Sequence, residues 1–340
     1  MEKTNKPEIF AVWICSEDKY MMPFLYEVCI ASWQILNPDF KVAVYTNNPQ
    51  LKYNFLSKDA TETRLIDDTI LEEAKELTRD TPTGMKFAHQ SDFVRYYILN
   101  KYGGMYVDAD LFCISPIKEL YEECIKENTP VVMAYEDTQR ICNAFLANFN
   151  ENGNLFYQDI LDNYRKRYVK SSYTFNSIKY PMIIKNKYKD LIRILPFKEG
   201  MFYPNWEKNA NGDLNLLKEP EMPDSMCGYG IHLYNTDIKW KEVRKIIEDN
   251  LYSDNLDWWV IKHLNNVMDK YMDLLPNIET RDIFKDKHLV DGLTKLYGED
   301  YLNQFKKGSI TIEPIVEQNE ERPEDTMKTY TCKGYTIRKE

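Results

Sequence analysis

Two aspartates separated by a single residue, Asp108 and Asp110, offer the clearest chemistry in the sequence. Mn²⁺ and Mg²⁺ prefer oxygen ligands, and enzymes normally supply one or two carboxylates while phosphates and water complete the set. In an extended backbone, residues two apart project to the same face, so both carboxylates can converge on one ion. Such an ion neutralises charge that grows on a departing diphosphate. On its own, the pattern also fits a solvated turn between strands.

A helix and a glycine turn are predicted immediately before this pair. Asp92 and Arg95 lie one turn apart on that helix, which ends at Gly103 and Gly104. A salt bridge between them on a solvated face would contribute only ~0.2–0.5 kcal/mol. The apolar stripe is too wide to leave much solvated surface, so we expect both side chains to face a polar cavity. The stripe comprises Phe87, Phe93, Val94, Tyr96, Ile98 and Leu99.

The run from Ser91 to Asp110 reads S-D-x-x-R-Y-x-x-L-x-x-Y-G-G-x-Y-x-D-x-D. It resembles the DxD-type sugar glycosyltransferase family, which includes fungal α-1,6-mannosyltransferases and bacterial capsule and lipopolysaccharide glycosyltransferases. Clostridial glucosylating toxins share the same core pattern. The match is long over residues 91–110 and is reduced to single positions elsewhere. The resemblance implies a GT-A fold, a nucleotide-sugar donor, a divalent metal and retention of anomeric configuration.

The resemblance also implies roles for individual residues. Asp92 and Arg95 would hold hydroxyls of the donor sugar, and Arg95 would also lie near the diphosphate. Tyr106 would pack at the nucleotide. Asp108 would contact ribose or sugar and reach the metal through water, whereas Asp110 would ligate the metal directly. The chemistry of the side chains agrees, because arginine is a rigid fork of donors and a carboxylate can accept from two neighbouring hydroxyls.

Four residues outside this block are candidates for contact with the nucleotide sugar. Trp13, on a predicted strand, would stack on uracil as an aromatic does in the toxin relatives, with core packing as the alternative. Thr46 and Asn47 lie at the end of the next predicted strand and either line the nucleotide pocket or form a plain turn. In the resembling family, an asparagine in the context of Asn143 lies at the sugar, near the reacting face. The alternative is an amide that satisfies backbone groups in a turn.

The segment 228–240 resembles the closing element of these transferases. There an apolar strand delivers a polar metal ligand, and a tryptophan follows on a loop. His232 is the candidate ligand, and Trp240 is the candidate loop aromatic over the sugar. The family's tight cluster ending in Ser-Trp is altered, since the spacing is longer and the serine is missing. The third metal ligand therefore stays open among His232, Asn235 and Asp237, and a lone histidine on an apolar strand is often a core residue.

Alternating buried strands and helices predict an α/β fold. Residues 8–15 and 41–48 are predicted strands, and residues 23–36 form the predicted helix between them. This βαβ unit is typical of open, Rossmann-like, mostly parallel sheets, whose ligands bind beyond the carboxyl ends of the strands. Further along, a short strand and a turn are predicted over 111–117, a helix over 116–127 and a strand over 130–136.

The chain is expected to have two parts. Residues 1–245 would form the GT-A nucleotide-sugar-binding catalytic domain. Residues 246–340 would form a mainly helical extension, ending in a β-hairpin with a Lys-Gly turn. We expect this extension to pack on the catalytic domain or to shape the acceptor site.

Composition argues against several classes of protein. The net charge of −10 is opposite to the basic footprint that nucleic-acid binding requires. Seven cysteines without a C-x-x-C pair and only four histidines do not fit a disulfide framework or a zinc site. The absence of a long apolar run and of a signal-like start predicts a cytoplasmic protein. The basic region 165–193 is either a solvated helix face or a docking site for a phosphorylated acceptor or the inner membrane face.

These observations predict a retaining glycosyltransferase that depends on Mn²⁺ or Mg²⁺. It would move a hexose or N-acetylhexosamine from a nucleotide-diphosphate sugar, with UDP favoured because of Trp13, to a glycan or lipid-linked glycan during surface polysaccharide synthesis. No carboxylate of the motif is an obvious nucleophile, so we expect the acceptor hydroxyl to attack on the face that the diphosphate leaves. The alternatives are a toxin-like protein glycosyltransferase, a GDP-mannose-using mannosyltransferase, a metal-dependent phosphohydrolase and a non-catalytic sugar-nucleotide-binding protein.

Overall fold

The fold is taken from a computed structural model of the 340-residue chain. It describes the backbone of most of the chain up to residue 274 and of three strands beyond it. The described residues are 6–16, 18–53, 55–57, 60–137, 139–172, 174–197, 199–202, 216–224, 226, 228–233, 238–251, 256–274, 312–314, 329–332 and 335–338.

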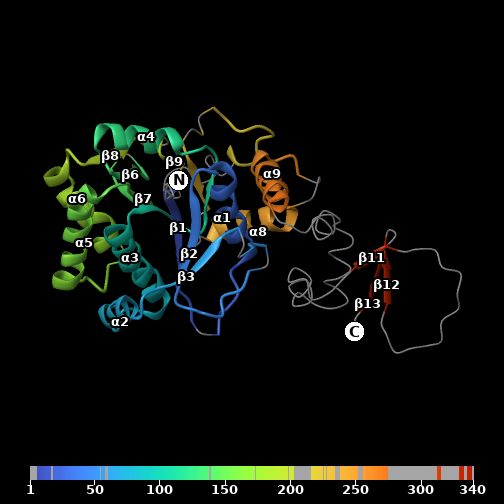
Figure 1. The fold of residues 1–340 in the computed structure, drawn as a ribbon, viewed down its shortest axis with the longest axis horizontal. Coiled ribbons are helices and arrows are strands. Elements are labelled where there is room, and N and C mark those ends of the chain that lie inside the picture. The colour runs from blue at the N-terminus through green and yellow to red at the C-terminus, as the bar shows by residue number, and fades with distance from the viewer. Residues whose placement is uncertain are drawn as a thin grey trace, which may run out of the picture.

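A seven-stranded sheet forms the centre of the structure (Figure 1). Its strand order is β3-β2-β1-β4-β7-β6-β8. All neighbours are parallel except the two that flank β7, so β7 alone runs against the other strands. The predicted mostly parallel α/β sheet is therefore confirmed. Its strands are β1 (Glu8–Trp13), β2 (Lys41–Thr46), β3 (Glu62–Leu65), β4 (Gly104–Val107), β6 (Val131–Tyr135), β7 (Ile141–Asn148) and β8 (Ile192–Leu195).

Helices cover both faces of this sheet (Figure 1). One face packs on α1 (Phe24–Leu36), α4 (Lys118–Glu127), α8 (Ile238–Asn250) and α9 (Trp259–Asp273). The opposite face packs on α2 (Asp68–Leu77), α3 (Thr83–Tyr102), α5 (Asn154–Arg167) and α6 (Tyr180–Ile184). Alternation along each strand divides its apolar side chains between these two cores. Short helical turns η1 (Glu151–Gly153), η2 (Phe175–Lys179) and η3 (Lys185–Tyr188) complete the helical elements described.

A small second sheet lies on the α1 side of the large one. Its strands are β5 (Leu111–Cys113), β10 (Gly230–His232) and β9 (Met201–Phe202), in the order β5-β10-β9. β10 runs antiparallel to β5 and parallel to β9. Apolar residues of β5 and β10 belong to the same core as α1, so this sheet packs on the same body as the large sheet.

The residues after 245 are helical at first and then extended. Residue 245 falls inside α8, and buried residues of α8 and α9 share the core of α1. The division of the chain at this point stays a prediction. Among the described helices, none is long and apolar enough to cross a membrane. A third sheet has the order β11-β13-β12, with both pairs antiparallel, and consists of β11 (Ile312–Pro314), β13 (Tyr335–Arg338) and β12 (Thr329–Cys332).

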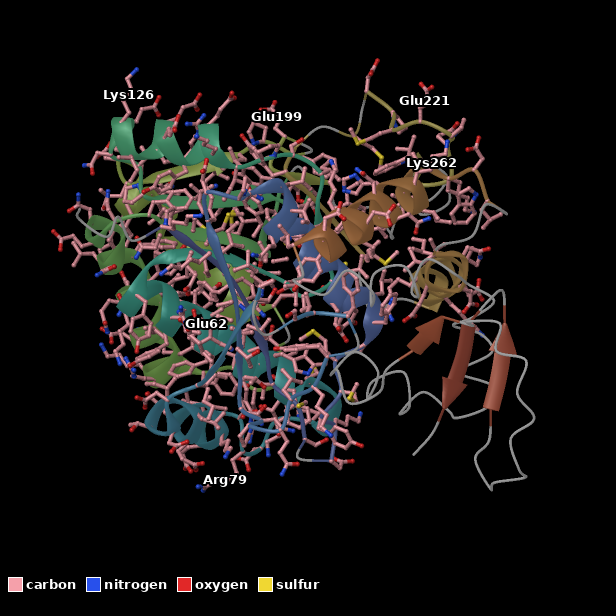
Figure 2. The ribbon with its side chains drawn as sticks, turned by 45° about the vertical axis from the view of Figure 1, so that its right-hand side comes forward. Glu62, Arg79, Lys126, Glu199, Glu221 and Lys262 are labelled. Carbon is pink, nitrogen blue, oxygen red and sulfur yellow. The ribbon has the colours of Figure 1, made fainter. Side chains whose placement is uncertain are left out.

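Charged side chains project outward from many elements, as Glu62, Arg79 and Lys126 do in Figure 2. In the basic region 165–193, four cations form ion pairs with acidic side chains, so their charges are compensated. The structure therefore gives no support for a membrane contact through this region. The pairs are Arg165 with Glu73 at 2.6 Å, Lys170 with Asp80 at 3.2 Å, Lys187 with Asp159 at 2.7 Å, and Arg193 with Glu123 at 2.7 Å.

Two glycines make the sharp turn from α3 into β4. Gly103 and Gly104 have φ angles of +70° and +98°, which other residues rarely adopt. A Cβ atom on Gly103 would lie 2.8 Å from the carbonyl oxygen of Asn148, and one on Gly104 would lie 2.8 Å from that of Glu8. The glycine pair therefore allows β4, and the aspartates after it, to enter the sheet between β1 and β7.

We predict that Gly104→Ala lowers the free energy of unfolding by roughly 2–4 kcal/mol, because it adds backbone strain and a backbone clash. Urea denaturation would measure the change. Asn128→Gly is the matched control, since Asn128 has a φ of +54° at the end of α4 and glycine adopts that angle freely. A Gly104→Ala protein as stable as this control would show that the turn relaxes without cost.

Candidate active site

The two aspartates lie in a tight turn at the carboxyl end of β4. The Leu111 N–H donates to the carbonyl oxygen of Asp108 at 3.0 Å, so residues 108–111 form a turn. This corrects the expectation of an extended backbone. The convergence of the carboxylates was predicted correctly, but its cause is the turn. Ligand atoms of Asp108, Asp110 and His232 all lie within 4.8 Å of one another.

His232 reaches this turn from the second sheet. It lies opposite Leu111 in the antiparallel pairing of β10 with β5, and the Leu233 N–H donates to the Asp110 carbonyl oxygen at 2.8 Å. Its Nε2 is 3.2 Å from Asp108 Oδ2 and 3.4 Å from Asp110 Oδ1. The structure thus brings His232 to both carboxylates, whereas the other two candidate ligands, Asn235 and Asp237, lie outside the described residues.

Arg95 connects the predicted sugar-binding residues to the aspartates. Its Nη2 is 3.1 Å from Asp92 Oδ1, and its Nη1 is 3.1 Å from Asp108 Oδ1. Nη1 also donates to the carbonyl oxygen of Asn143 at 2.7 Å. The side chains of Arg95 and Asp92 are only 6% and 8% exposed. Their ion pair is therefore part of a buried network and not a salt bridge on a solvated helix face.

Asn143 lies inside an irregular part of β7. Where β6 passes from Met133 to Ala134, the paired residue on β7 jumps from Leu146 to Cys142. The extra residues form a bulge, a feature that often re-aims side chains next to active sites. The Asn143 side-chain amide donates to Asp92 Oδ1 at 2.9 Å. The amide therefore binds a side chain of the site, and not the backbone of a turn.

Tyr106 contacts both Asp108 and Arg95 from within the protein core. It is 1% exposed, its hydroxyl donates to Asp108 Oδ1, and the Arg95 guanidinium lies 4.2 Å from the centre of its ring. The resemblance implied a contact with the nucleotide, but alternation along β4 directs this side chain into the α3 core, where it packs on Phe10. Tyr106 therefore holds Asp108 and Arg95 in place.

The other nucleotide candidates differ in position. Trp13 is half-buried at the carboxyl end of β1 and lies edge-on to Tyr26 at 5.4 Å. A hydrogen bond from its side chain opposes the larger effect of burial, which raises the pKa of the Cys15 thiol. Thr46 is fully buried, and its hydroxyl accepts from the Asn48 N–H at 3.1 Å, which fits the turn alternative. Asn47 bonds the backbone at the end of β1. Among these residues, Trp13 presents a half-buried aromatic ring at the strand ends.

The resemblance implied that Trp240 lies on a loop. In the structure it lies in the first turn of α8. The sequence Ile238–Asn250 contains no proline or glycine, so the helix starts earlier than the family pattern suggests. The side chain of Trp240 lies outside the part of the chain that the structure describes.

Burial and charge make the site strongly electrostatic. Burial by itself raises the pKa of Asp108, but Arg95 and His232 outweigh it and bring that pKa to about 2. Burial raises the pKa of Asp110, with His232 opposing and Asp108 adding to the rise. Burial also raises the pKa of Asp92 to about 6 against the effect of Arg95. Two carboxylates and an imidazole in such a place are a ligand set that a divalent cation would fit.

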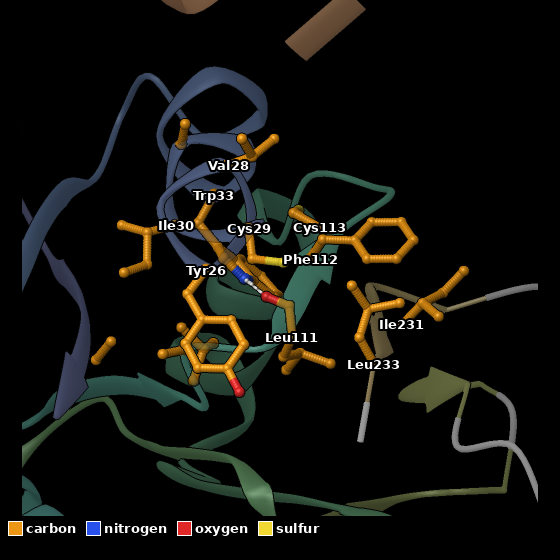
Figure 3. Packing of buried hydrophobic residues seen from close by; sticks show 14 of the residues in the cluster. Tyr26, Val28, Cys29, Ile30, Trp33, Leu111, Phe112, Cys113, Ile231 and Leu233 are labelled. Carbon is orange, nitrogen blue, oxygen red and sulfur yellow. Dashed lines mark hydrogen bonds between the residues drawn. The ribbon is translucent and has the colours of Figure 1, made fainter. Parts of the chain in front are cut away.

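Side chains within and directly after helix α1 hold the aspartate turn through hydrogen bonds to the backbone that follows it. The sequence analysis did not predict this role. The Trp33 indole N–H donates to the Leu111 carbonyl oxygen at 2.7 Å (Figure 3). Ser32 Oγ accepts from the Cys113 N–H at 2.7 Å, and Asn37 Oδ1 accepts from the backbone after β5 at 2.8 Å. All three side chains are buried. Their only sequence signal is polar atoms within and directly after an otherwise apolar helix.

We expect Trp33→Phe to lower the free energy of unfolding by about 1–3 kcal/mol, because it leaves a buried carbonyl without its donor. The variant should also bind Mn²⁺ more weakly, since the carbonyl adjoins Asp110. Tyr157→Phe is the control, because the Tyr157 hydroxyl donates to a buried carbonyl on the other face of the sheet at 2.8 Å. Calorimetric titration should find weaker Mn²⁺ binding only in Trp33→Phe. Equal Mn²⁺ affinity in both variants would contradict the role of Trp33.

Arg95→Met should be one of the most destabilising single changes. It leaves the carboxylates of Asp92 and Asp108 buried without their cation, which typically costs about 3–5 kcal/mol. Arg165→Met removes a half-exposed ion pair instead and should change stability by only ~0–1 kcal/mol. Thermal and urea denaturation would compare the two. A small loss for both would mean that water replaces the guanidinium.

Comparison with known proteins gives one family match, and it covers part of this site but neither Asn143 nor His232. Residues 23–131 match the family model described as the glycosyltransferase sugar-binding region containing a DXD motif. That range includes α1, α3 and both aspartates. No curated protein sequence matches the chain.

Several solved glycosyltransferase structures are loosely similar. GlyE of Streptococcus pneumoniae TIGR4 is 15% identical, with 80% of this chain and 64% of that chain covered and a TM-score of 0.44. The galactosyltransferase LgtC, in complex with donor and acceptor sugar analogues, is 8% identical, with coverage of 80% and 97% and a TM-score of 0.41. The UDP-bound glycosyltransferase domain of the YGT toxin is 10% identical, with coverage of 89% and 99% and a TM-score of 0.36. Residues 23–131 are a glycosyltransferase sugar-binding region with a DXD motif, and the protein is a glycosyltransferase.

Proposed function

We propose that this glycosyltransferase depends on Mn²⁺ or Mg²⁺ and retains anomeric configuration. It moves a hexose or N-acetylhexosamine from a UDP-sugar to a glycan or lipid-linked glycan, in surface polysaccharide synthesis. One observation carries the metal dependence, namely the convergence of Asp108, Asp110 and His232 within 4.8 Å in a buried site. Three donors of this kind leave room for phosphate oxygens and water in an octahedral set.

Asp110 and His232 would hold the metal, and Asp108 would reach it directly or through water. When bound, the metal neutralises negative charge on the diphosphate of the donor. Because His232 comes from a different sheet, the cation would also tie β10 to the aspartate turn. Orientation of the donor sugar and further stabilisation of the leaving diphosphate would depend on protein side chains.

Arg95 would orient the donor sugar and stabilise the leaving diphosphate. Its guanidinium is fixed by Asp92, Asp108 and the carbonyl oxygen of Asn143, so little reorganisation is needed when negative charge develops nearby. Asp92 would accept hydrogen bonds from hydroxyls of the sugar, and the Asn143 amide keeps its carboxylate in position. The acceptor hydroxyl would then attack on the face from which the diphosphate departs.

Trp13 supports a UDP-linked donor. It is half-buried at the carboxyl end of β1, the edge of a parallel sheet at which ligands bind, and it offers a flat aromatic ring. A pyrimidine base could stack on this ring while its diphosphate extends to the aspartates after β4, the neighbouring strand.

Metal removal tests this proposal. In EDTA, UDP should bind about tenfold more weakly or worse than in Mn²⁺, a difference of about 1.4 kcal/mol or more, because diphosphate and carboxylates then repel each other. Asp110→Asn should show the same weak binding even in Mn²⁺. Asp257→Asn is the control, since Asp257 is an exposed carboxylate paired with Lys262 far along the chain. Calorimetric titration would measure all four affinities, and equal values would remove the metal from the proposed site.

The transferase activity needs its own measurement. UDP release from UDP-glucose, UDP-galactose and their N-acetyl forms, followed in Mn²⁺, should occur with the wild-type protein and nearly vanish with Asp110→Asn. Binding without any release would favour a protein that keeps the pocket but not turnover.

A further inference from the structure

Helix α9 anchors a segment that starts beside Trp13. This post-β2 segment, residues 47–53 and 55–57, follows β2 at the carboxyl edge of the sheet. The last residue of β2, Thr46, lies opposite Trp13 in the parallel pairing with β1, so the segment leaves the sheet next to the tryptophan. Parallel sheets bind their ligands beyond this edge. The proposed mechanism uses neither α9 nor this segment.

The first residue of the post-β2 segment binds the chain that follows Trp13. Asn47 Nδ2 donates to the Cys15 carbonyl oxygen at 2.8 Å, and Asn47 Oδ1 accepts from the Cys15 N–H at 3.0 Å. The Cys15 thiol forms a hydrogen bond with the side chain of Trp13. Further along, the Lys52 N–H donates to the Tyr20 carbonyl oxygen at 2.7 Å. The position of the Trp13 ring therefore depends on the position of Asn47.

The other end of the post-β2 segment is anchored to α1. The carboxylate of Glu27, which is completely buried, accepts from the N–H groups of Phe55 and Leu56 at 2.5 Å and 2.9 Å. Glu27 adjoins Tyr26, whose ring packs edge-on against Trp13. The same turn of α1 thus supports the tryptophan and binds the end of the segment.

α9 adds a second polar anchor at this end. Tyr271 is fully buried in the last turns of α9, and its hydroxyl accepts from the Ser57 N–H at 3.0 Å. The hydroxyl also lies 3.1 Å from Thr61 Oγ1, and the two rings of Tyr271 and Phe55 are 5.0 Å apart. Loss of the hydroxyl would break both polar contacts in a place that water does not reach, so it would loosen the end of the post-β2 segment.

Other side chains hold the aspartate turn. Arg95 binds Asp108, and Trp33 binds the backbone directly after Asp110. Under the proposed function, the aspartate turn meets the diphosphate and Trp13 meets the base. The two ends of a bound nucleotide would therefore depend on different supports, and their binding energies can be changed separately.

We propose that Tyr271 is a positioning residue for the base-binding end of the donor site. Its hydroxyl holds the post-β2 segment in place, and through Asn47 and Cys15 this segment fixes the Trp13 ring at the distance from the aspartates that a nucleoside diphosphate requires. This role rests on the proposed use of a UDP-sugar. It gives α9 a part in nucleotide binding, although the helix itself need not touch the nucleotide.

The test compares the affinities for UDP and for inorganic pyrophosphate, both in Mg²⁺. Pyrophosphate reports the diphosphate end alone, whereas UDP reports both ends. Tyr271→Phe removes the hydroxyl and keeps the ring. Asn47→Asp disrupts the other end of the segment, because a carboxylate cannot donate to the Cys15 carbonyl oxygen. Tyr157→Phe is the matched control, since the buried Tyr157 hydroxyl donates to a backbone carbonyl on the opposite face of the sheet at 2.8 Å.

Calorimetric titration should find that Tyr271→Phe binds UDP about fivefold more weakly and binds pyrophosphate as the wild type does. Asn47→Asp should show the same pattern. Because both changes act on Trp13 through one series of contacts, adding Tyr271→Phe to Asn47→Asp should weaken UDP binding little further. Tyr157→Phe should bind both ligands with wild-type affinity.

Unchanged UDP affinity in Tyr271→Phe would overturn the proposal. Equal losses for UDP and pyrophosphate, an equal UDP loss in Tyr157→Phe, or fully additive losses in the double variant would also overturn it. If Tyr271→Phe does not fold, Thr61→Val replaces it, because this change removes only one partner of the hydroxyl. It should give a smaller loss for UDP alone, and no loss would count against the proposal. A wild-type protein that binds UDP no more tightly than pyrophosphate would instead reject the proposed UDP site.

Discussion

The buried charge of Arg95 is the constraint on which the rest of the site depends. One guanidinium group binds Asp92 on its own helix, Asp108 after β4 and a backbone carbonyl of β7. These elements carry negative or electronegative groups that would repel one another in a buried place. The arginine therefore has two tasks at once. It holds three segments together in the folded protein, and under the proposed function it keeps a fixed positive charge near the leaving diphosphate.

A second layer of contacts holds the aspartate turn from the opposite side. The polar atoms of Ser32, Trp33 and Asn37 bind the backbone of β5 and of the residues after it. β5 in turn pairs with β10 and so aligns His232. The geometry of the metal-ligand cluster is thus set by backbone hydrogen bonds between two sheets and one helix. Such support gives a site its precision, because the ligands themselves need not find their positions by side-chain flexibility.

Local patterns in the sequence predicted much of this structure. The βαβ unit, the helix ending at Gly103 and the strand before Asp108 follow from periodicity and glycine geometry, and Asp92 and Arg95 follow from their position on that helix. The features that were not predicted depend on contacts between distant segments. The bulge around Asn143 arises from pairing with β6, and the burial of Tyr106 depends on which face of β4 meets α3. The loop expected at Trp240 was also wrong, because α8 begins at Ile238 and its sequence contains no proline or glycine.

The reversed direction of β7 has a consequence for how such a site can change over evolutionary time. Because β6 and β7 form a hairpin, the segment that joins them, residues 136–140, begins and ends at the edge where ligands bind. Insertions or deletions there would alter the sheet edge near Asn143 while the aspartate turn, held by Arg95 and Trp33, kept its place. The fold thus separates a part that can vary in length from a part that cannot. A change of substrate would then require neither a new metal site nor a rearranged sheet.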